Sequence, residues 1–190
     1  NLKTVNSVGS STAVVAASEV TPANNPTPPT INSVATSSRT ITVAFTIPTS
    51  NGGVAISGYE YSTDGGTTWR ARTDSGGTST SLVITKLSSD GTTLLTNGLS
   101  YAVSIRAVTA STVGLSSSNV FATPSTTPSA PTNATFSVLN ARIDVDFTAG
   151  SDGGSPITNY EYALSTNGGT SWEPVGSIQP NTSKIVVDEL

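Results

Sequence analysis

The chain has 190 residues, enough for one large domain or two small ones, and its charged fraction of 11% means that the surface consists mostly of Ser, Thr, Asn and Gly. The formal net charge of −4, without any run of Lys or Arg, disfavours nucleic acid as a partner, and no segment has the roughly 18 consecutive apolar residues of a membrane span. Because Cys and His are both absent, the chain has no disulfide, no Ser-His-Asp or Cys-His catalytic site and no His or Cys metal site, and we expect no cofactor.

Short alternating runs of apolar and polar residues, bounded by Gly, Pro, Asn and Ser, follow one another along the chain. They predict strands, and no long helical period interrupts them, so we expect an all-β fold. Two of these runs, Thr40–Ile47 and Arg142–Thr148, each place three apolar side chains on one face, including Phe45 and Phe147. The same strand therefore occurs twice in the sequence.

Further landmarks repeat at a nearly constant distance along the chain. The pairs are Pro29 with Pro131 and Phe45 with Phe147 (102 residues apart), Tyr59 with Tyr160 and Tyr61 with Tyr162 (101 apart), and Trp69 with Trp172 and Leu87 with Leu190 (103 apart). A period close to the size of one small domain, with several short strands in each copy, is typical of tandem β-sandwiches.

The segments ITVAFTIP, ISGYEYS and LSYAVSIRAV, followed by a Pro-rich joint, resemble the fibronectin type III family, and the resemblance extends over almost the whole chain. It implies tandem immunoglobulin-like (fibronectin type III) β-sandwiches in which these segments are strands B, C and F. It also implies that Tyr101 is the tyrosine-corner residue, whose hydroxyl bonds to backbone upstream. The family usually carries Trp on strand B, where this chain has Phe45 and Phe147. We assign structural roles to nine aromatic residues: Phe45, Tyr59, Tyr61, Trp69, Tyr101, Phe147, Tyr160, Tyr162 and Trp172.

The first residues align with Ile105–Pro124, because Leu2 matches Ile105, Val5 matches Val108, and Gly9 matches Gly114 after a small gap. We therefore expect residues 1–24 to be the C-terminal strands of a preceding domain, residues 25–127 a complete domain, and residues 128–190 an incomplete domain with strands A to E. The simpler interpretation is a window of a longer array. The alternative is strand complementation, in which residues 1–24 of one copy complete the last domain of another. The opening segment carries strand G but only the end of strand F, so it would complete that domain in part.

The residues from Ser62 to Trp69 form the pattern S-x-D-x-G-x-T-W, which resembles the sialidase Asp-box. A propeller of that kind should repeat about every 40 to 50 residues. Here the pattern recurs 103 residues later, as STNGGTSW at Ser165–Trp172. Asp-Gly-Gly and Asn-Gly-Gly between alternating runs predict hairpin turns, so we expect each copy to join strands C and C′ with the Trp folded over the turn.

The acidic residues most open to a catalytic interpretation are Asp144, Asp146 and Asp152. The first two alternate with apolar residues along a strand, which predicts that both lie on the solvent face, and Asp152 lies in a glycine-rich loop. We interpret all three as solvated strand and turn acids rather than as a glycosidase pair. No D-x-D-x-D-G loop offers calcium ligands.

Two sequons, two arginines and two glycine loops each allow a structural and a functional interpretation. Asn133 and Asn181 begin N-glycosylation sequons, which arise often by chance in a chain so rich in Ser, Thr and Asn. Arg70 and Arg72 could form a small recognition patch, but Glu173 occupies the matching region of the second copy. The glycine loops at residues 50–58 and 151–159 open no helix, so we expect B to C loops rather than phosphate cradles.

The Pro-rich joints at Asn24–Thr30 and Pro124–Thr132 predict semi-rigid spacers between domains, and domains linked in this way form a rod. We expect a non-catalytic structural or adhesive repeat segment of an extracellular, microbial surface protein: an adhesin, fibre or stalk filament. Its expected partners are neighbouring repeats or other copies of itself, with a cell-surface or glycan ligand left open. The alternatives are spacer domains of a large secreted carbohydrate-active enzyme, and a module that binds a ligand with its loops.

Overall fold

The computed structural model describes residues 1–14, 23–178 and 183–188, and these residues form strands, turns and loops without a helix. The expected all-β fold is confirmed for this part of the chain. The sequon at Asn181 and the landmark at Leu190 lie outside the described residues. In the described ranges, no helix has the length and apolar character needed to cross a membrane.

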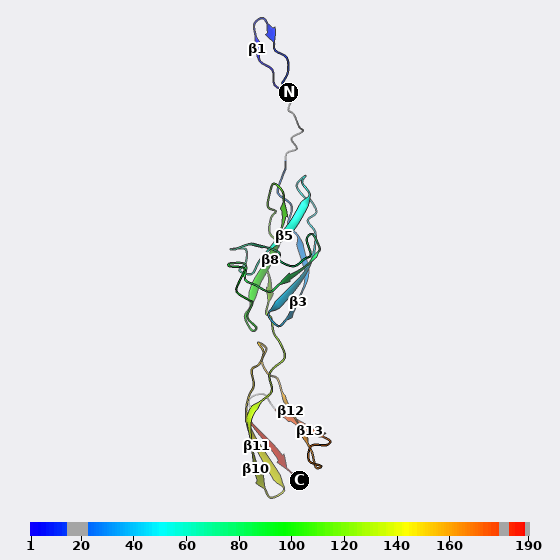
Figure 1. The fold of residues 1–190 in the computed structure, drawn as a ribbon, viewed down its shortest axis with the longest axis vertical. Helices are drawn as coiled ribbons and strands as arrows, with labels where there is room; N and C mark the ends of the chain where they lie inside the picture. Colours follow the sequence, from blue (N-terminus) through cyan, green and yellow to red (C-terminus); the bar gives the residue numbers. More distant parts are fainter. Residues whose placement is uncertain (15–22, 179–182, 189–190) are drawn as a thin grey trace.

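The first large group of strands, here called unit 1, comprises residues 23–124 and has two antiparallel sheets (Figure 1). One sheet has the order β3-β4-β7, with β3 at Thr30–Ser37, β4 at Thr40–Thr46 and β7 at Ser81–Ile84. The other has the order β6-β5-β8-β9, with β6 at Arg70–Ala71, β5 at Ile56–Ser62, β8 at Tyr101–Thr109 and β9 at Val120–Ala122. The strands predicted from the alternating runs are therefore present.

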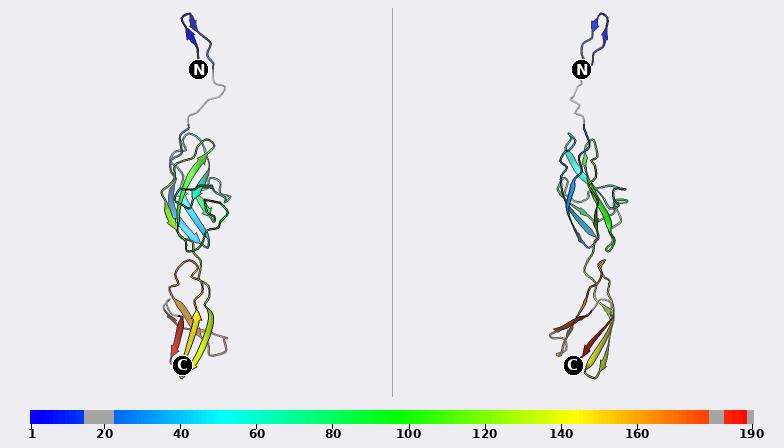
Figure 2. Two further views of the ribbon diagram at one scale, coloured as in Figure 1. Left: turned by 90° about the vertical axis from the view of Figure 1, so that its left-hand side faces the viewer. Right: turned by 180° about the vertical axis from the view of Figure 1, so that it is seen from behind.

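The second group, here called unit 2, comprises the described residues from 125 to 188 and repeats part of this plan. One sheet has the order β10-β11-β14, with β10 at Thr132–Leu139, β11 at Arg142–Thr148 and β14 at Lys184–Asp188. The other pairs β12 at Tyr160–Leu164 with β13 at Glu173–Ile178. The two units lie end to end along the long axis of the molecule (Figures 1 and 2).

The core of unit 1 lies between its two sheets, as the alternation along the strands requires. Phe45 on β4 meets Tyr59 on β5 edge to face, with ring centroids 4.6 Å apart. In unit 2, Phe147 and Tyr160 repeat this pair at 4.8 Å. The inward face predicted for both Phe-bearing strands is therefore confirmed, and an aromatic contact joins the two sheets of each unit.

Two further aromatic residues of unit 1, Tyr61 and Tyr101, are also in the core. Tyr61 is 1% exposed and Tyr101 is 5% exposed. The Tyr101 hydroxyl accepts a hydrogen bond from the backbone amide of Thr96 at 2.8 Å, five residues upstream. The expected bond from this hydroxyl to upstream backbone is confirmed.

A small separate hairpin is formed near the N-terminus by β1 at Val5–Asn6 and β2 at Gly9–Ser10. A further bridge pairs Leu2 with Val14. Its apolar side chains are largely exposed: Leu2 by 76%, Val5 by 75% and Val14 by 73%. Nothing in the hairpin itself covers these side chains.

The prediction that Asp144 is solvated is wrong. Asp144 lies on the sheet face away from the core, but its side chain is only 8% exposed because Arg142 and Lys184 cover it, at 2.5 and 2.8 Å from its carboxylate oxygens. Hydrogen bonds from Arg142 and then from Lys184 lower its pKa to about 2. Asp146 is exposed, as predicted.

Candidate functional site

The hairpin between β5 and β6 has a side-chain network that explains its Asp-box pattern. The Asp64 carboxylate accepts hydrogen bonds from the Ser62 hydroxyl at 2.7 Å and from the backbone amide and hydroxyl of Thr68 at 2.9 and 2.6 Å. The Ser62 oxygen in turn accepts the Gly66 amide at 2.8 Å. Trp69 folds back, and its indole nitrogen donates to the Gly66 carbonyl at 2.9 Å. These hydrogen bonds connect the residues of the motif in one network, which holds the turn closed.

Burial alone would raise the pKa of Asp64. Hydrogen bonds from the side chain and backbone of Thr68, and then from Ser62, outweigh burial and hold the pKa below its ordinary value. The carboxylate is therefore ionised at neutral pH and is saturated by donors of its own turn. A general acid or base in catalysis needs the opposite, a proton that exchanges near the working pH.

The hairpin between β12 and β13 repeats the network with different side chains. Asn167 takes the place of Asp64, and its carbonyl oxygen accepts the Ser165 hydroxyl and the Ser171 amide, both at 3.0 Å. Its amide group donates to the Ser171 hydroxyl at 2.8 Å. Since a neutral amide serves the same geometry, the charge of Asp64 is not essential to the turn. The prediction of two structural hairpin turns is confirmed.

One face of the Trp69 ring contacts an arginine side chain. The Arg106 guanidinium, on β8, lies 4.2 Å from the centre of the Trp69 ring. Its nitrogen also pairs with the Glu60 carboxylate of β5 at 2.7 Å. Trp172, the counterpart of Trp69, is 61% exposed. The alternation of YAVSIRAV, which turns Arg106 outward, is the sequence signal that could have singled it out.

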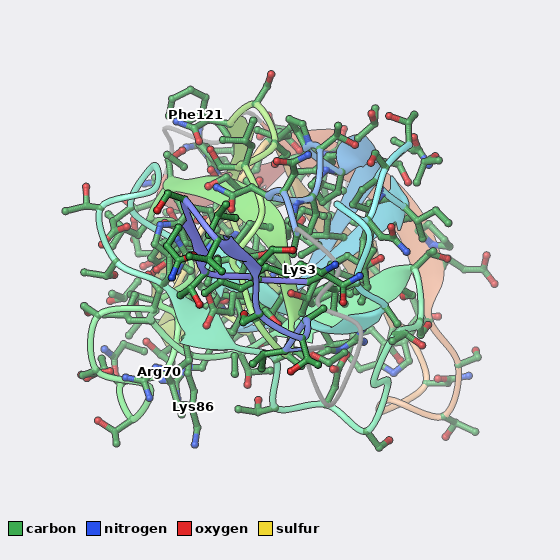
Figure 3. The ribbon with its side chains drawn as sticks, turned by 90° about the horizontal axis from the view of Figure 1, so that it is seen from above. Lys3, Arg70, Lys86 and Phe121 are labelled. Atoms are coloured by element: carbon green, nitrogen blue, oxygen red, sulfur yellow. The ribbon has the colours of Figure 1, made fainter. Side chains whose placement is uncertain are left out.

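Arg70 and Arg72, considered above as a small recognition patch, do not lie together on one exposed surface. Arg72 is 5% exposed, and its guanidinium is held by the Asp74 carboxylate at 2.6 Å and by three backbone carbonyls, of Gly77, Ser79 and Ser81. Its role is to anchor the irregular segment before β7. Arg70 remains at the surface, on the same side of the molecule as Lys86 (Figure 3).

A second exposed feature of unit 1 is Phe121 on β9, which is 74% exposed and points outward at the edge of the molecule (Figure 3). Single exposed apolar side chains are normal on protein surfaces. In the described segments, no group of three or more acidic, His or Cys side chains is placed to hold a metal ion.

Backbone hydrogen bonds hold the joint between the units. The Gly98 amide donates to the Pro124 carbonyl at 2.9 Å, the Thr126 amide donates to the Gly153 carbonyl at 2.9 Å, and the Ser129 amide donates to the Ser151 carbonyl at 2.9 Å. The linker is therefore tied to a turn of unit 1 at one end and to the glycine loop of unit 2 at the other. This loop lies between β11 and β12, as predicted for a B to C loop.

Unit 1 binds its own preceding linker in the same way. The Asn24 amide donates to the Gly52 carbonyl at 2.8 Å, and the Thr27 amide donates to the Ser50 carbonyl at 3.0 Å. A side chain at Gly52 would collide with the carbonyl of Asn24, and one at Gly153 would collide with that of Thr126. Glycine at this loop position therefore lets the loop lie directly against the linker in both units.

The two units also touch directly at the joint. Gly154, with a φ of +90°, lies so close to the turn of unit 1 that a Cβ there would be 2.7 Å from the carbonyl carbon of Asn97 and would collide with Gly98. Beside this contact runs a groove of about 770 Å³, lined among others by Arg39, Leu99 and Asp152. The sequence indicated the linkers but not this contact, which depends on how two distant turns meet.

In comparisons with known proteins, no family model matches the chain, and no curated protein matches it.

Proposed function

We propose that the chain is a non-catalytic structural segment, in which fibronectin type III-like sandwiches are coupled in tandem as a stiff spacer in an extracellular surface protein, fibre or stalk. The observation that carries this proposal is the joint, where backbone hydrogen bonds fix the linker at both ends. The direct contact of Gly98 with Gly154 supports it further, because flexible linkers leave adjacent domains without such contacts.

The sandwich plan of unit 1 supports the family assignment within this proposal. Its sheets of three and four strands, its aromatic contact between β4 and β5, and the bond from the Tyr101 hydroxyl to upstream backbone agree with what the family resemblance implies. The saturated Asp-box network supports a structural role for the most conspicuous motif. The joint is compatible with a spacer in a surface fibre and with a spacer in a secreted enzyme.

The proposal predicts a narrow distribution of distances between the units. Because the chain has no Cys, Ala35→Cys and Ser137→Cys would place two spin labels on exposed positions of β3 and β10 without background. Pulsed electron resonance should give one narrow distance peak. Gly154→Val should broaden or shift it, because the new side chain collides with the turn of unit 1.

Gly53→Val is the matched control, because Gly53 holds the same loop position in unit 1 and its φ of +91° matches the +90° of Gly154. Backbone strain is therefore similar in both variants, and Gly53 lies in the loop of unit 1 that faces the preceding linker. A distribution that is as broad in the unaltered chain as in Gly154→Val would contradict a stiff spacer.

A further inference from the structure

Asn-Gly dipeptides occur at Asn51, Asn97 and Asn167, each in a loop or turn between strands. In such a pair the backbone nitrogen of the glycine can attack the side-chain carbonyl carbon of the asparagine, because glycine has no side chain to obstruct the approach. The reaction requires the asparagine side chain to move freely over the following peptide bond. Local hydrogen bonds therefore decide which of the three can react.

The Asn97 side chain is held at both ends of its amide group. Its Oδ1 accepts the backbone amide of Arg39 at 2.7 Å, and its Nδ2 donates to the Ser38 hydroxyl at 3.2 Å. The Gly98 amide, which would have to attack it, donates to the Pro124 carbonyl at 2.9 Å. Cyclisation at Asn97 must first break these bonds.

The Asn167 side chain is held by the turn network described above. Its Oδ1 accepts the Ser165 hydroxyl and the Ser171 amide, and its Nδ2 donates to the Ser171 hydroxyl. The side chain cannot rotate toward the next peptide bond without losing several of these bonds. Asn167 is therefore restrained as Asn97 is, although by different partners.

The Asn51 side chain is held much less firmly. Among the described residues it makes one hydrogen bond, in which its Oδ1 accepts the Gly53 amide at 2.9 Å. This bond folds the side chain toward the Gly52 peptide and polarises the carbonyl carbon that the nitrogen would attack. The Gly52 amide donates to the Ser50 hydroxyl at 3.2 Å. Asn51 is exposed to the water that the reaction consumes.

The second unit shows that the same loop accommodates an aspartate. Asp152 holds the position of Asn51, and its Oδ1 accepts the Gly154 amide at the same distance of 2.9 Å. Asp152 is exposed even though unit 1 lies against this loop. A unit packed in the same way against Gly53 would therefore leave Asn51 accessible.

We propose that Asn51 is a site of spontaneous deamidation, and that its isoaspartate product releases the linker from unit 1. The Gly52 nitrogen bonds to the Asn51 Cγ, the Cγ–Nδ2 bond breaks, and ammonia leaves with the proton of the Gly52 amide. Water then opens the succinimide ring that has formed. Opening at Cγ gives aspartate, and opening at the main-chain carbonyl gives isoaspartate, in which the backbone runs through Cγ and is longer by a methylene group.

The loop has no space for a longer backbone. The Asn24 amide of the linker donates to the Gly52 carbonyl at 2.8 Å. Even a Cβ at Gly52 would collide with the Asn24 carbonyl. A methylene group inserted between Asn51 and Gly52 displaces the Gly52 carbonyl, so the bond to Asn24 is lost. The meaning of this release for a stiff spacer rests on the function proposed above, whereas the chemistry of Asn51 does not.

The first test compares the three asparagines within the 190-residue chain. The chain is kept in mildly alkaline buffer, where the amide nitrogen loses its proton more readily, and peptide mapping by mass spectrometry follows each site. We expect Asn51 to convert at least about tenfold faster than Asn97 or Asn167, because fewer hydrogen bonds must break. In urea the three rates should converge. Asn51→Gln should prevent the reaction at this site, because its longer side chain must close a larger ring.

The second test measures amide hydrogen exchange by NMR in the isoaspartate form, after its separation from the aspartate form. The Asn24 amide should be protected in the unaltered chain and should exchange at least about tenfold faster in the isoaspartate form. The Thr126 amide, which bonds to the Gly153 carbonyl in unit 2, should keep its protection. Asn51→Asp is the matched control, since it has the charge of the product without the longer backbone and should keep Asn24 protected.

Three results would overturn the proposal. Asn51 could convert no faster than Asn97 or Asn167 in the folded chain, the Asn24 amide could stay protected in the isoaspartate form, or Asn51→Asp could expose it equally. The spacer function is tested separately by the distance between the spin labels. A broad peak together with fast conversion of Asn51 would remove the stiff spacer and retain the reaction, and a narrow peak without conversion would do the reverse.

Discussion

The Asp64 network predicts that a neutral amide can replace the carboxylate, whereas an apolar side chain cannot. Asp64→Ala removes the acceptor of three hydrogen bonds, two from Thr68 and one from Ser62. Hydrogen bonds to charged groups contribute about 1.5 to 3 kcal/mol each when shielded, but water reaches this exposed turn and replaces much of that. We therefore expect a loss of about 2 kcal/mol in the free energy of unfolding of unit 1.

Asp64→Asn should cost less than about 1 kcal/mol, because Asn167 makes the equivalent bonds in unit 2. Urea unfolding followed by Trp69 fluorescence measures both losses, and Trp172→Phe leaves Trp69 as the single indole. The reasoning fails if Asp64→Asn is as damaging as Asp64→Ala, or if Asp64→Ala has no effect.

The pH dependence gives a second check on the same residue. Because the folded pKa of Asp64 is lowered, its contribution is present above the unfolded pKa of about 3.9 and is lost as pH falls through the folded pKa. The difference in stability between the unaltered chain and Asp64→Asn should therefore shrink below pH 4. A difference that stays constant down to low pH would exclude a stabilising role of the ionised carboxylate.

Three further predictions concern the anchors of each unit. Tyr101→Phe removes the acceptor of the partly buried hydrogen bond from the Thr96 backbone amide and should lower the free energy of unfolding of unit 1 by about 1 kcal/mol in urea; no change would refute that role. Arg72→Met leaves Asp74 without its cation and should cost about 3 kcal/mol in the same assay, whereas a surface role would leave stability unaltered. The lowered pKa of Asp144, about 2, means that its contribution is present above the unfolded value of about 3.9 and is lost toward pH 2, so Asp144→Asn should flatten the acid limb of thermal unfolding of unit 2.

The strands and the inward face of each unit could be predicted because they depend on local alternation. In a strand, successive side chains point to opposite sides, so TITVAFT and RIDVDFT assign Phe45 and Phe147 to the core without knowledge of any partner. The hairpin turns were predictable for the same local reason, since Asp-Gly-Gly and Asn-Gly-Gly lie within one turn. The recurrence of these landmarks after about one hundred residues indicated a second unit.

Tertiary structure alone decided how side chains from separate strands and loops meet. Arg72 resembled a surface cation, but Asp74 and three carbonyls enclose its guanidinium. Asp144 resembled a solvated acid, but Lys184 on a neighbouring strand covers it. The contact of Gly98 with Gly154 joins turns more than fifty residues apart. Alternation determines which face a residue occupies, whereas its exposure and charge environment depend on the strand or loop beside it, which only the folded chain brings there.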